Sequence, residues 1–232
     1  MWYIWKMGEK IMIKVIYEDN HLLVVEKPVN ILSQGDNTND KDMVNLLKDY
    51  IKKKYNKPGN VYIGLIHRLD RPVGGVMVFA KTSKAASRLS EQVRSKTFKK
   101  TYLAVVHGKI KSNSDILKDF LYKNKKTNMV TVVKKSHKDA KEAELNYNVL
   151  DFKENLSLVQ VNLKTGRSHQ IRVQFASRKH PLYGDQRYGK EINKIGQQIS
   201  LWSNKIEICH PTTKEKMEFT CHPPDKYPWN IF

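Results

Sequence analysis

The chain of 232 residues carries 42 Lys and Arg against 23 Asp and Glu, which gives a formal net charge of +19 at pH 7. Because 40% of the residues are apolar and 9% are aromatic, the composition excludes a disordered polycation and predicts a folded body with a basic surface. This charge favours a polyanion such as nucleic acid as the partner. The alternative is a lysine-rich protein whose solvated faces are basic throughout.

Both cysteines are followed by histidine, in Cys209-His210 and Cys221-His222. If both pairs lie on strands, neighbouring side chains point to opposite faces, so one metal ion could not easily collect all four ligands. We therefore predict buried hairpin cysteines and no metal. With only two cysteines, no signal peptide and no apolar run long enough to cross a bilayer, the sequence predicts a cytoplasmic protein.

The first half of the chain alternates between strand and helix patterns. We interpret residues 1–12 as a peripheral extension, because no pattern in them continues into the rest of the chain. Lys27-Pro28 ends the first predicted hairpin. The elements predicted up to residue 94 are a hairpin of 14–17 with 22–25, a surface loop over 29–40, a helix over 42–54, a strand over 76–80 and a helix over 83–94.

The second half is richer in strands. Its clearest signal is a run of alternating apolar and polar residues that ends at the turn Thr165-Gly166. The predicted elements are strands over 102–106, 143–150 and 156–163, a helix over 169–176, and a hairpin of 205–209 with 217–221. Because strands dominate and helices intervene, the order predicts an α+β fold.

Three basic segments concentrate polar residues without the spacing of an amphipathic face: residues 67–75, 99–104 and 163–172. In the first, Asp70 stands between two arginines on a turn that precedes a buried strand. The neighbouring cations favour the ionised carboxylate, which suits a nucleophile better than a general acid. Taken alone, these residues equally allow an aspartate that caps the turn or pairs with Arg68.

Five motifs follow one another along the chain. They are Val24-Val25-Glu26-Lys27-Pro28, His67-Arg68-Leu69-Asp70-Arg71-Pro72-Val73-Gly74-Gly75, Lys100-Thr101-Tyr102-Leu103-Ala104, Thr165-Gly166-Arg167-Ser168-His169-Gln170-Ile171-Arg172 and His180-Pro181-Leu182-Tyr183-Gly184-Asp185. In order and spacing they resemble the pseudouridine synthases of the RluA type, over about residues 13–224. Five motifs in order are far more specific than one. The resemblance implies one catalytic domain over 13–232, with a mixed, mainly antiparallel central sheet flanked by helices and loops, and no S4-like RNA-binding domain before it.

The resemblance also implies a role for each matched residue. Asp70 matches the catalytic aspartate, which attacks the target uridine so that the base detaches at N1, rotates and rejoins the ribose through C5. Tyr102 matches the tyrosine that packs against the base. Arg172 matches the basic residue that pairs with the aspartate, and Arg167 is the second candidate for that place. The expected RNA-binding residues are Arg68, beside the flipped nucleotide, with Arg71, Arg167, His169, Gln170, Lys99 and Lys100.

The implied partner is structured RNA, ribosomal or transfer, with no cofactor, no membrane partner and a monomeric chain. For His169 and Gln170, a structural role at the Thr165-Gly166 turn is the alternative. The chain departs from the family at Gly74, where a hydroxyl residue is common, so a local hydrogen bond is absent or supplied elsewhere. A catalytically silent RNA-binding protein and a metal-dependent nuclease are the rival functions, and no acidic cluster supports the second.

Overall fold

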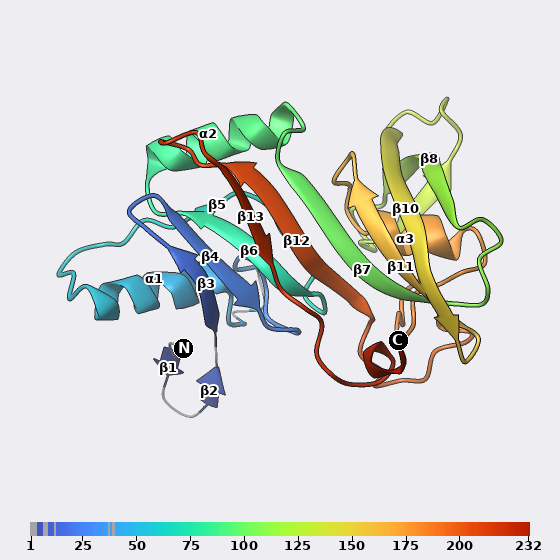
Figure 1. Cartoon of the computed structure of the whole chain (residues 1–232). Helices are drawn as coiled ribbons and strands as arrows, with labels where there is room; N and C mark the ends of the chain where they lie inside the picture. The colour runs from blue at the N-terminus through green and yellow to red at the C-terminus, as the bar shows by residue number, and fades with distance from the viewer. Residues whose placement is uncertain (1–3, 7–8, 12, 37, 39) are drawn as a thin grey trace. The chain divides into compact units, whose positions relative to one another are not determined.

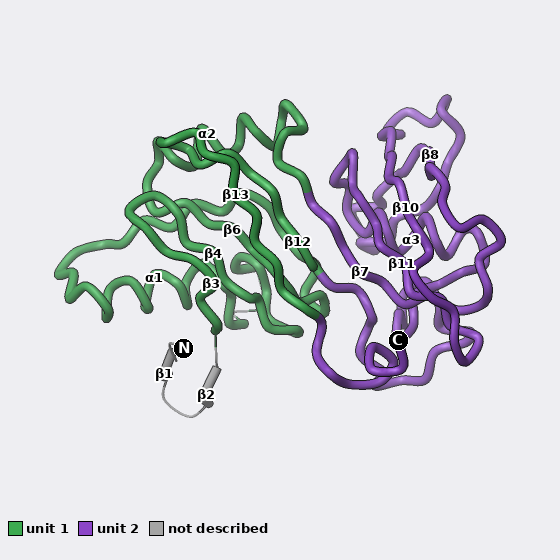
Figure 2. The backbone as a smooth tube through the Cα atoms, viewed as in Figure 1, with its two compact units in different colours: residues 1–99, 203–222 green, residues 100–202, 223–232 purple. Residues whose placement is uncertain are grey.

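The computed structural model describes residues 4–6, 9–11, 13–36, 38 and 40–232, and it combines β-strands with a few helices (Figure 1). The chain divides into two compact units (Figure 2). Unit 1 comprises residues 1–99 and 203–222, and unit 2 comprises residues 100–202 and 223–232. The interpretation of residues 13–232 as one catalytic domain stays a prediction.

The sheet of unit 1 is built around β6, which is buried at every residue. Both predicted hairpins are present, because β3 pairs antiparallel with β4 and β12 pairs antiparallel with β13. The strands in sheet order are β3 (Lys14–Glu18), β4 (Leu22–Lys27), β6 (Gly74–Ala80) and β12 (Leu201–Cys209, in unit 1 from Ser203), while β5 (Gly64–Leu65) pairs with β6 and β13 (Lys216–Thr220) with β12.

Both predicted helices of unit 1 are confirmed. The helix α1 (Met43–Lys54) begins after Asp42, whose side chain accepts a hydrogen bond from the Asn45 N–H and so caps the helix. The helix α2 (Ser83–Arg94) begins after Thr82, which caps it in the same way. The apolar face of α1 is buried, as its helical spacing predicts: Met43, Leu46, Leu47, Tyr50 and Ile51.

One buried carboxylate, Glu18 at the end of β3, ties α1 to the sheet. It accepts hydrogen bonds from Tyr50 Oη at 2.8 Å, Lys54 Nζ at 2.7 Å, Tyr55 Oη at 2.8 Å and Lys81 Nζ at 2.8 Å. Burial alone would raise its pKa, but these donors outweigh that effect and lower the pKa of Glu18 to about 2. Glu18 therefore stays ionised and serves the structure.

Unit 2 contains an antiparallel sheet that the sequence predicted only in part. The predictions for β7, β10 and β11 are confirmed, whereas β8, β9 and the short β5 of unit 1 were not predicted. The strand β8 shows no clean alternation of buried and exposed residues. Its pairing with β10, and not a local sequence pattern, defines it as a strand. The strands in sheet order are β7 (Lys99–His107), β11 (Leu156–Leu163), β10 (Lys141–Lys153), β8 (Ser114–Lys123) and β9 (Val130–Val133).

The helix α3 (Gln170–Ala176) confirms the last predicted helix to within one residue. Its Val173 packs in a cluster with Leu121, Val130 and Ala143, against which Tyr188 also packs. A 3₁₀ turn, η1 (Trp229–Ile231), lies close to the C-terminus. These elements confirm the α+β class and the mainly antiparallel sheet. No helix among the described residues is long and apolar enough to cross a membrane.

The predicted extension contains a small hairpin of β1 (Ile4–Lys6) and β2 (Glu9–Ile11), which pair with each other. Its residues 1–3, 7, 8 and 12 lie outside the described part of the chain. Of the two cysteines expected to be buried, Cys221 is buried and Cys209 is half-buried. Within the described residues, no three His, Cys, Asp or Glu side chains group as metal ligands.

Candidate active site

Asp70 lies in unit 1, on the turn between β5 and β6 that the sequence predicted. The Val73 N–H donates to the Asp70 carbonyl oxygen at 2.9 Å, which closes the turn just before β6 begins. The Asp70 side chain is half-buried. Asp70 is therefore partly accessible to solvent, and it lies four residues before the buried strand β6.

A fully buried lysine, Lys27, holds this turn from beneath. Its Nζ donates to the carbonyl oxygens of Val73 at 2.7 Å, Arg71 at 3.0 Å and Pro28 at 3.0 Å. Burial lowers the pKa of Lys27 to about 7, while the negative charge of Asp70 acts to raise it. The charge of Asp70 therefore favours the protonated form of Lys27, and three otherwise buried carbonyls gain a donor.

Two further contacts determine the path of the chain on either side of Asp70. Ser33 Oγ accepts from the Leu69 N–H at 3.0 Å and donates to the Leu69 carbonyl at 2.7 Å. Gly75 has a φ of +115°, and a Cβ there would lie 2.2 Å from the Ser203 carbonyl oxygen, so only glycine fits. These bonds all involve main-chain atoms, so none of them uses the Asp70 carboxylate.

The two arginines beside Asp70 are placed differently. Arg68 is exposed, and its guanidinium has no partner within the described part of the chain. Arg71 is also exposed, but it forms an ion pair with Asp40 at 2.6 Å and donates to the Asn30 carbonyl at 3.3 Å. Of the two, Arg68 is the better candidate for contact with RNA.

In unit 2, residues 100–104 lie beside residues 159–166. Tyr102 lies on β7 opposite Val161 of β11 and is nearly buried. The turn at Gly166 packs against Lys100, because a Cβ at Gly166 would lie 3.1 Å from Lys100 Nζ. Burial lowers the pKa of Lys100. Lys99, by contrast, is exposed and lies in unit 1, 3.3 Å from Glu207.

The side chain of Gln170 holds the turn of residues 165–167. Its Oε1 accepts from Thr165 Oγ1 at 2.8 Å and from the Arg167 N–H at 3.0 Å, and its Nε2 donates to the Glu144 carbonyl at 3.1 Å. Gln170 is only 3% exposed. It therefore has the structural role that the sequence left open. Arg167 is exposed and donates from Nε to the Glu142 carbonyl at 2.8 Å.

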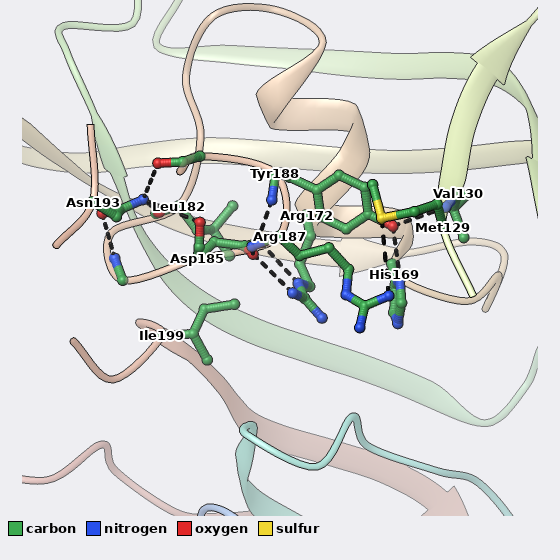
Figure 3. A network of polar contacts seen from close by, with 12 residues as sticks. Met129, Val130, His169, Arg172, Leu182, Asp185, Arg187, Tyr188, Asn193 and Ile199 are labelled. Carbon is green, nitrogen blue, oxygen red and sulfur yellow. Dashed lines mark hydrogen bonds and ion pairs between the residues drawn. The ribbon is translucent and has the colours of Figure 1, made fainter. Parts of the chain in front are cut away.

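A buried ion pair fixes Arg172 (Figure 3). Its Nε and Nη2 donate to the two carboxylate oxygens of Asp185, each at 2.8 Å. The N–H groups of Arg187 and Tyr188 donate to the same carboxylate. Burial alone would raise the pKa of Asp185, but these donors outweigh it and lower that pKa below its ordinary value of 3.8. Arg172 thus has a partner that the sequence did not assign to it.

Tyr188 links this ion pair to its surroundings in unit 2. Its hydroxyl accepts from the Val130 N–H at 3.0 Å and lies 2.7 Å from His169 Nδ1. The Arg172 guanidinium lies over the Tyr188 ring, 5.3 Å from its centre. His169 adopts a left-handed conformation, with a φ of 51°, directly before α3. The ring of His169 is thereby oriented by Tyr188.

The structure places the three residues with predicted catalytic roles in different units, Asp70 in unit 1 and Tyr102 and Arg172 in unit 2. Their convergence stays a prediction. Sequence reasoning gave no structural role to Lys27, and it did not single out Tyr188. Lys27 ends an apolar strand just before a proline, which is the only local signal that it could be buried.

Comparison with known proteins assigns the chain to a family. A family model described as RNA pseudouridylate synthase matches residues 21–177. The chain therefore belongs to the RNA pseudouridylate synthase family. The match includes the segments of Asp70, Tyr102 and Arg172.

Relatives and solved structures agree with this family. The chain is 34% identical over 209 residues to an uncharacterized RNA pseudouridine synthase, YhcT, of Bacillus subtilis, covering 87% of this chain and 65% of the relative. It is 33% identical over 215 residues to ribosomal large subunit pseudouridine synthase C of Buchnera aphidicola, covering 88% and 65%. The chain thus spans about 65% of the length of these relatives. Human RNA pseudouridylate synthase domain containing 4 shares the fold, with a TM-score of 0.77, 20% identity and coverage of 91% and 88%.

Proposed function

We propose that the chain isomerises specific uridines in structured RNA to pseudouridine, with Asp70 as the nucleophile. In this reaction the bond from the ribose C1′ to N1 breaks, and the base rotates. A bond from C1′ to C5 then forms, C5 loses its proton and N1 gains one. No group enters or leaves overall, so the isomerisation requires no cofactor.

The observation that carries this proposal is the construction of the Asp70 turn. Lys27, Ser33 and the Val73 N–H hold it through main-chain atoms, and the carboxylate takes no part in those bonds. A side chain presented on a turn built in this way suits chemistry better than capping. Family membership supports the same role for Asp70.

The remaining roles extend this proposal to unit 2. Tyr102 would pack against the target base, and Arg172 would pair with Asp70 in addition to Asp185. The exposed Arg68 would occupy the space that the flipped nucleotide leaves in the RNA stack, which offsets part of an unstacking cost of a few kcal/mol. The substrate proposed first is ribosomal RNA, since several relatives are named as large-subunit synthases, and the second is transfer RNA.

Release of tritium from C5-labelled uridine in transcribed ribosomal and transfer RNA tests the proposal. We expect release by the intact chain and no detectable release by Asp70→Asn, with RNA binding unchanged within about threefold. The matched control is Asp151→Asn on β10, whose side chain is 42% exposed and which should retain activity. Pseudouridine formation by Asp70→Asn would refute the nucleophile, and RNA binding without any release by the intact chain would favour a silent binder.

A further inference from the structure

Residues 123–141, which we name the lysine arm, concentrate positive charge. The arm contains seven lysines and one acidic residue, Asp139. It thus carries about a third of the net charge of +19 in about a twelfth of the length. A chain that was evenly lysine-rich would not show this concentration. The lysines are Lys123, Lys125, Lys126, Lys134, Lys135, Lys138 and Lys141.

All seven of these lysines are exposed. Within the described part of the chain, none of them forms an ion pair or a side-chain hydrogen bond. Elsewhere many lysines are paired, as Lys54 and Lys81 are with Glu18. Unpaired like charges held close together repel one another. Binding of a polyanion relieves this repulsion and therefore lowers the free energy of the arm.

The main chain of the arm is ordered around these charges. The Asn124 N–H donates to the Met129 carbonyl at 2.8 Å, and Asn124 Oδ1 accepts from the N–H of Lys126 at 2.9 Å and of Thr127 at 3.2 Å. Beyond this turn, β9 pairs with β8 as the edge strand of the unit 2 sheet. The rings of Tyr122 and His137 lie in contact, 4.4 Å apart. Three of the lysines therefore lie on this hydrogen-bonded hairpin, and the other four follow β9.

The arm is also attached to the network around Arg172 (Figure 3). The Val130 N–H donates to Tyr188 Oη at 3.0 Å. Arg187 Nη1 donates to the Asn128 carbonyl at 3.0 Å. Tyr188 in turn contacts His169 and Arg172, both of which have proposed roles at the site. Whatever binds the arm is therefore held at a defined position relative to Arg172.

We propose that the lysine arm binds the phosphate backbone of a helical segment of the RNA substrate. This inference rests on the proposed function, since it assigns a second contact surface to the same RNA. Three of the lysines lie at one end of β9 and four follow its other end. The four residues of β9 span roughly 13 Å. Two separate groups of charges suit the regularly spaced phosphates of an A-form helix, where recognition depends on shape and backbone.

The chemistry of lysine supports this choice of ligand. An ammonium is a point charge without the planar fork with which arginine reads a base edge, so the arm positions RNA without reading its sequence. The arm would hold a helical part of the RNA, while the residues around Asp70 select and flip the target uridine. It therefore contributes to affinity and not to the chemical step.

Substitution of four arm lysines tests the proposal. The arm variant is K125Q/K126Q/K134Q/K135Q, and the charge-matched control replaces four exposed lysines of unit 1, K52Q/K57Q/K84Q/K216Q. Binding of an RNA hairpin with a 20-base-pair stem and of a 12-nucleotide single-stranded oligouridylate is measured against salt concentration. For the hairpin, we expect the arm variant to lose about tenfold or more in affinity and its salt slope to fall by about 3. The control should lose less than about threefold.

Two results would overturn the proposal. Equal hairpin affinities and salt slopes for the arm and control variants would show that only net charge matters. Equal losses on the hairpin and on the oligouridylate would show that the arm does not prefer a helix. Binding is measured separately from tritium release, and turnover of the bound hairpin by the arm variant should stay unchanged at saturation. A failure of the proposed function would appear as absent release by the intact chain, whatever the binding data show.

Discussion

The turn of Asp70 in unit 1 and the surroundings of Arg172 in unit 2 are both held by several hydrogen bonds, but the groups that form these bonds differ. Around Asp70, donors and acceptors reach main-chain atoms, with Lys27 on three carbonyls. Around Arg172, the carboxylate of Asp185 itself receives the bonds. The carboxylate of Asp185 thus supports the structure directly, whereas the bonds described at the turn of Asp70 end on main-chain atoms.

This difference predicts that substitutions of the two aspartates separate stability from activity. Replacing Asp185 should make the chain easier to unfold, because the buried guanidinium of Arg172 then loses its charge partner. Replacing Asp70 should leave the free energy of unfolding almost unchanged. Replacing Lys27 lies between these cases, since it removes hydrogen bonds to three main-chain carbonyls.

The largest loss of stability is expected for Asp185→Asn. Breaking one side of a buried ion pair costs about 3–5 kcal/mol, and Asp185 is only 1% exposed. Urea unfolding at pH 7 measures the change, with Asp151→Asn as the control, since its pair with Lys153 is exposed and should contribute little to stability. A loss below about 1 kcal/mol for Asp185→Asn would contradict the structural role.

The same variant carries a pH signature. Because the pKa of Asp185 is lowered on folding, its contribution is complete above 3.8, its ordinary pKa, and is lost as the pH falls through the lower pKa of the folded chain. The stability difference between the intact chain and Asp185→Asn should therefore narrow below about pH 4. A difference that stays constant down to pH 2 would mean that the carboxylate charge contributes nothing.

A smaller loss is expected for Lys27→Met. The change leaves the carbonyls of Pro28, Arg71 and Val73 without their donor, but it also removes the cost of burying an amine, so we expect a net loss of about 2 kcal/mol. Urea unfolding measures it beside Lys14→Met on the neighbouring strand, whose exposed pair with Glu26 should contribute about 0.5 kcal/mol or less. If Lys27→Met matched Lys14→Met, the turn would not depend on the lysine.

The smallest change in stability is expected for Asp70→Asn, within about 0.5 kcal/mol of the intact chain. The reason is that the bonds closing its turn use the main chain, which the substitution keeps. The same urea series provides the measurement. A loss above about 2 kcal/mol would mean that Asp70 caps the turn, which is the alternative that its neighbouring arginines allowed.

Local pattern accounts for much of the fold. Where apolar spacing is regular, as in α1 and β11, the elements lie where the sequence predicts them, because the same periodicity determines which face is buried. The strands β8 and β9 were missed, since the pairing of β8 with β10 and of β9 with β8 supplies what their own residues do not signal. No element was therefore predicted over most of the lysine arm.

For the candidate site, sequence alone identified Asp70, Tyr102 and Arg172 through motifs, and a motif records which residue types recur at a given spacing. It does not record the partners of those residues. Lys27 is buried against three carbonyls, and Asp185 accepts two hydrogen bonds from Arg172. Both arrangements depend on residues that the fold of each unit brings together. The amino-acid order thus determined the family and the chemical groups. Only the tertiary structure decided which charges are buried and which carboxylate supports the fold, because burial depends on contacts between distant segments.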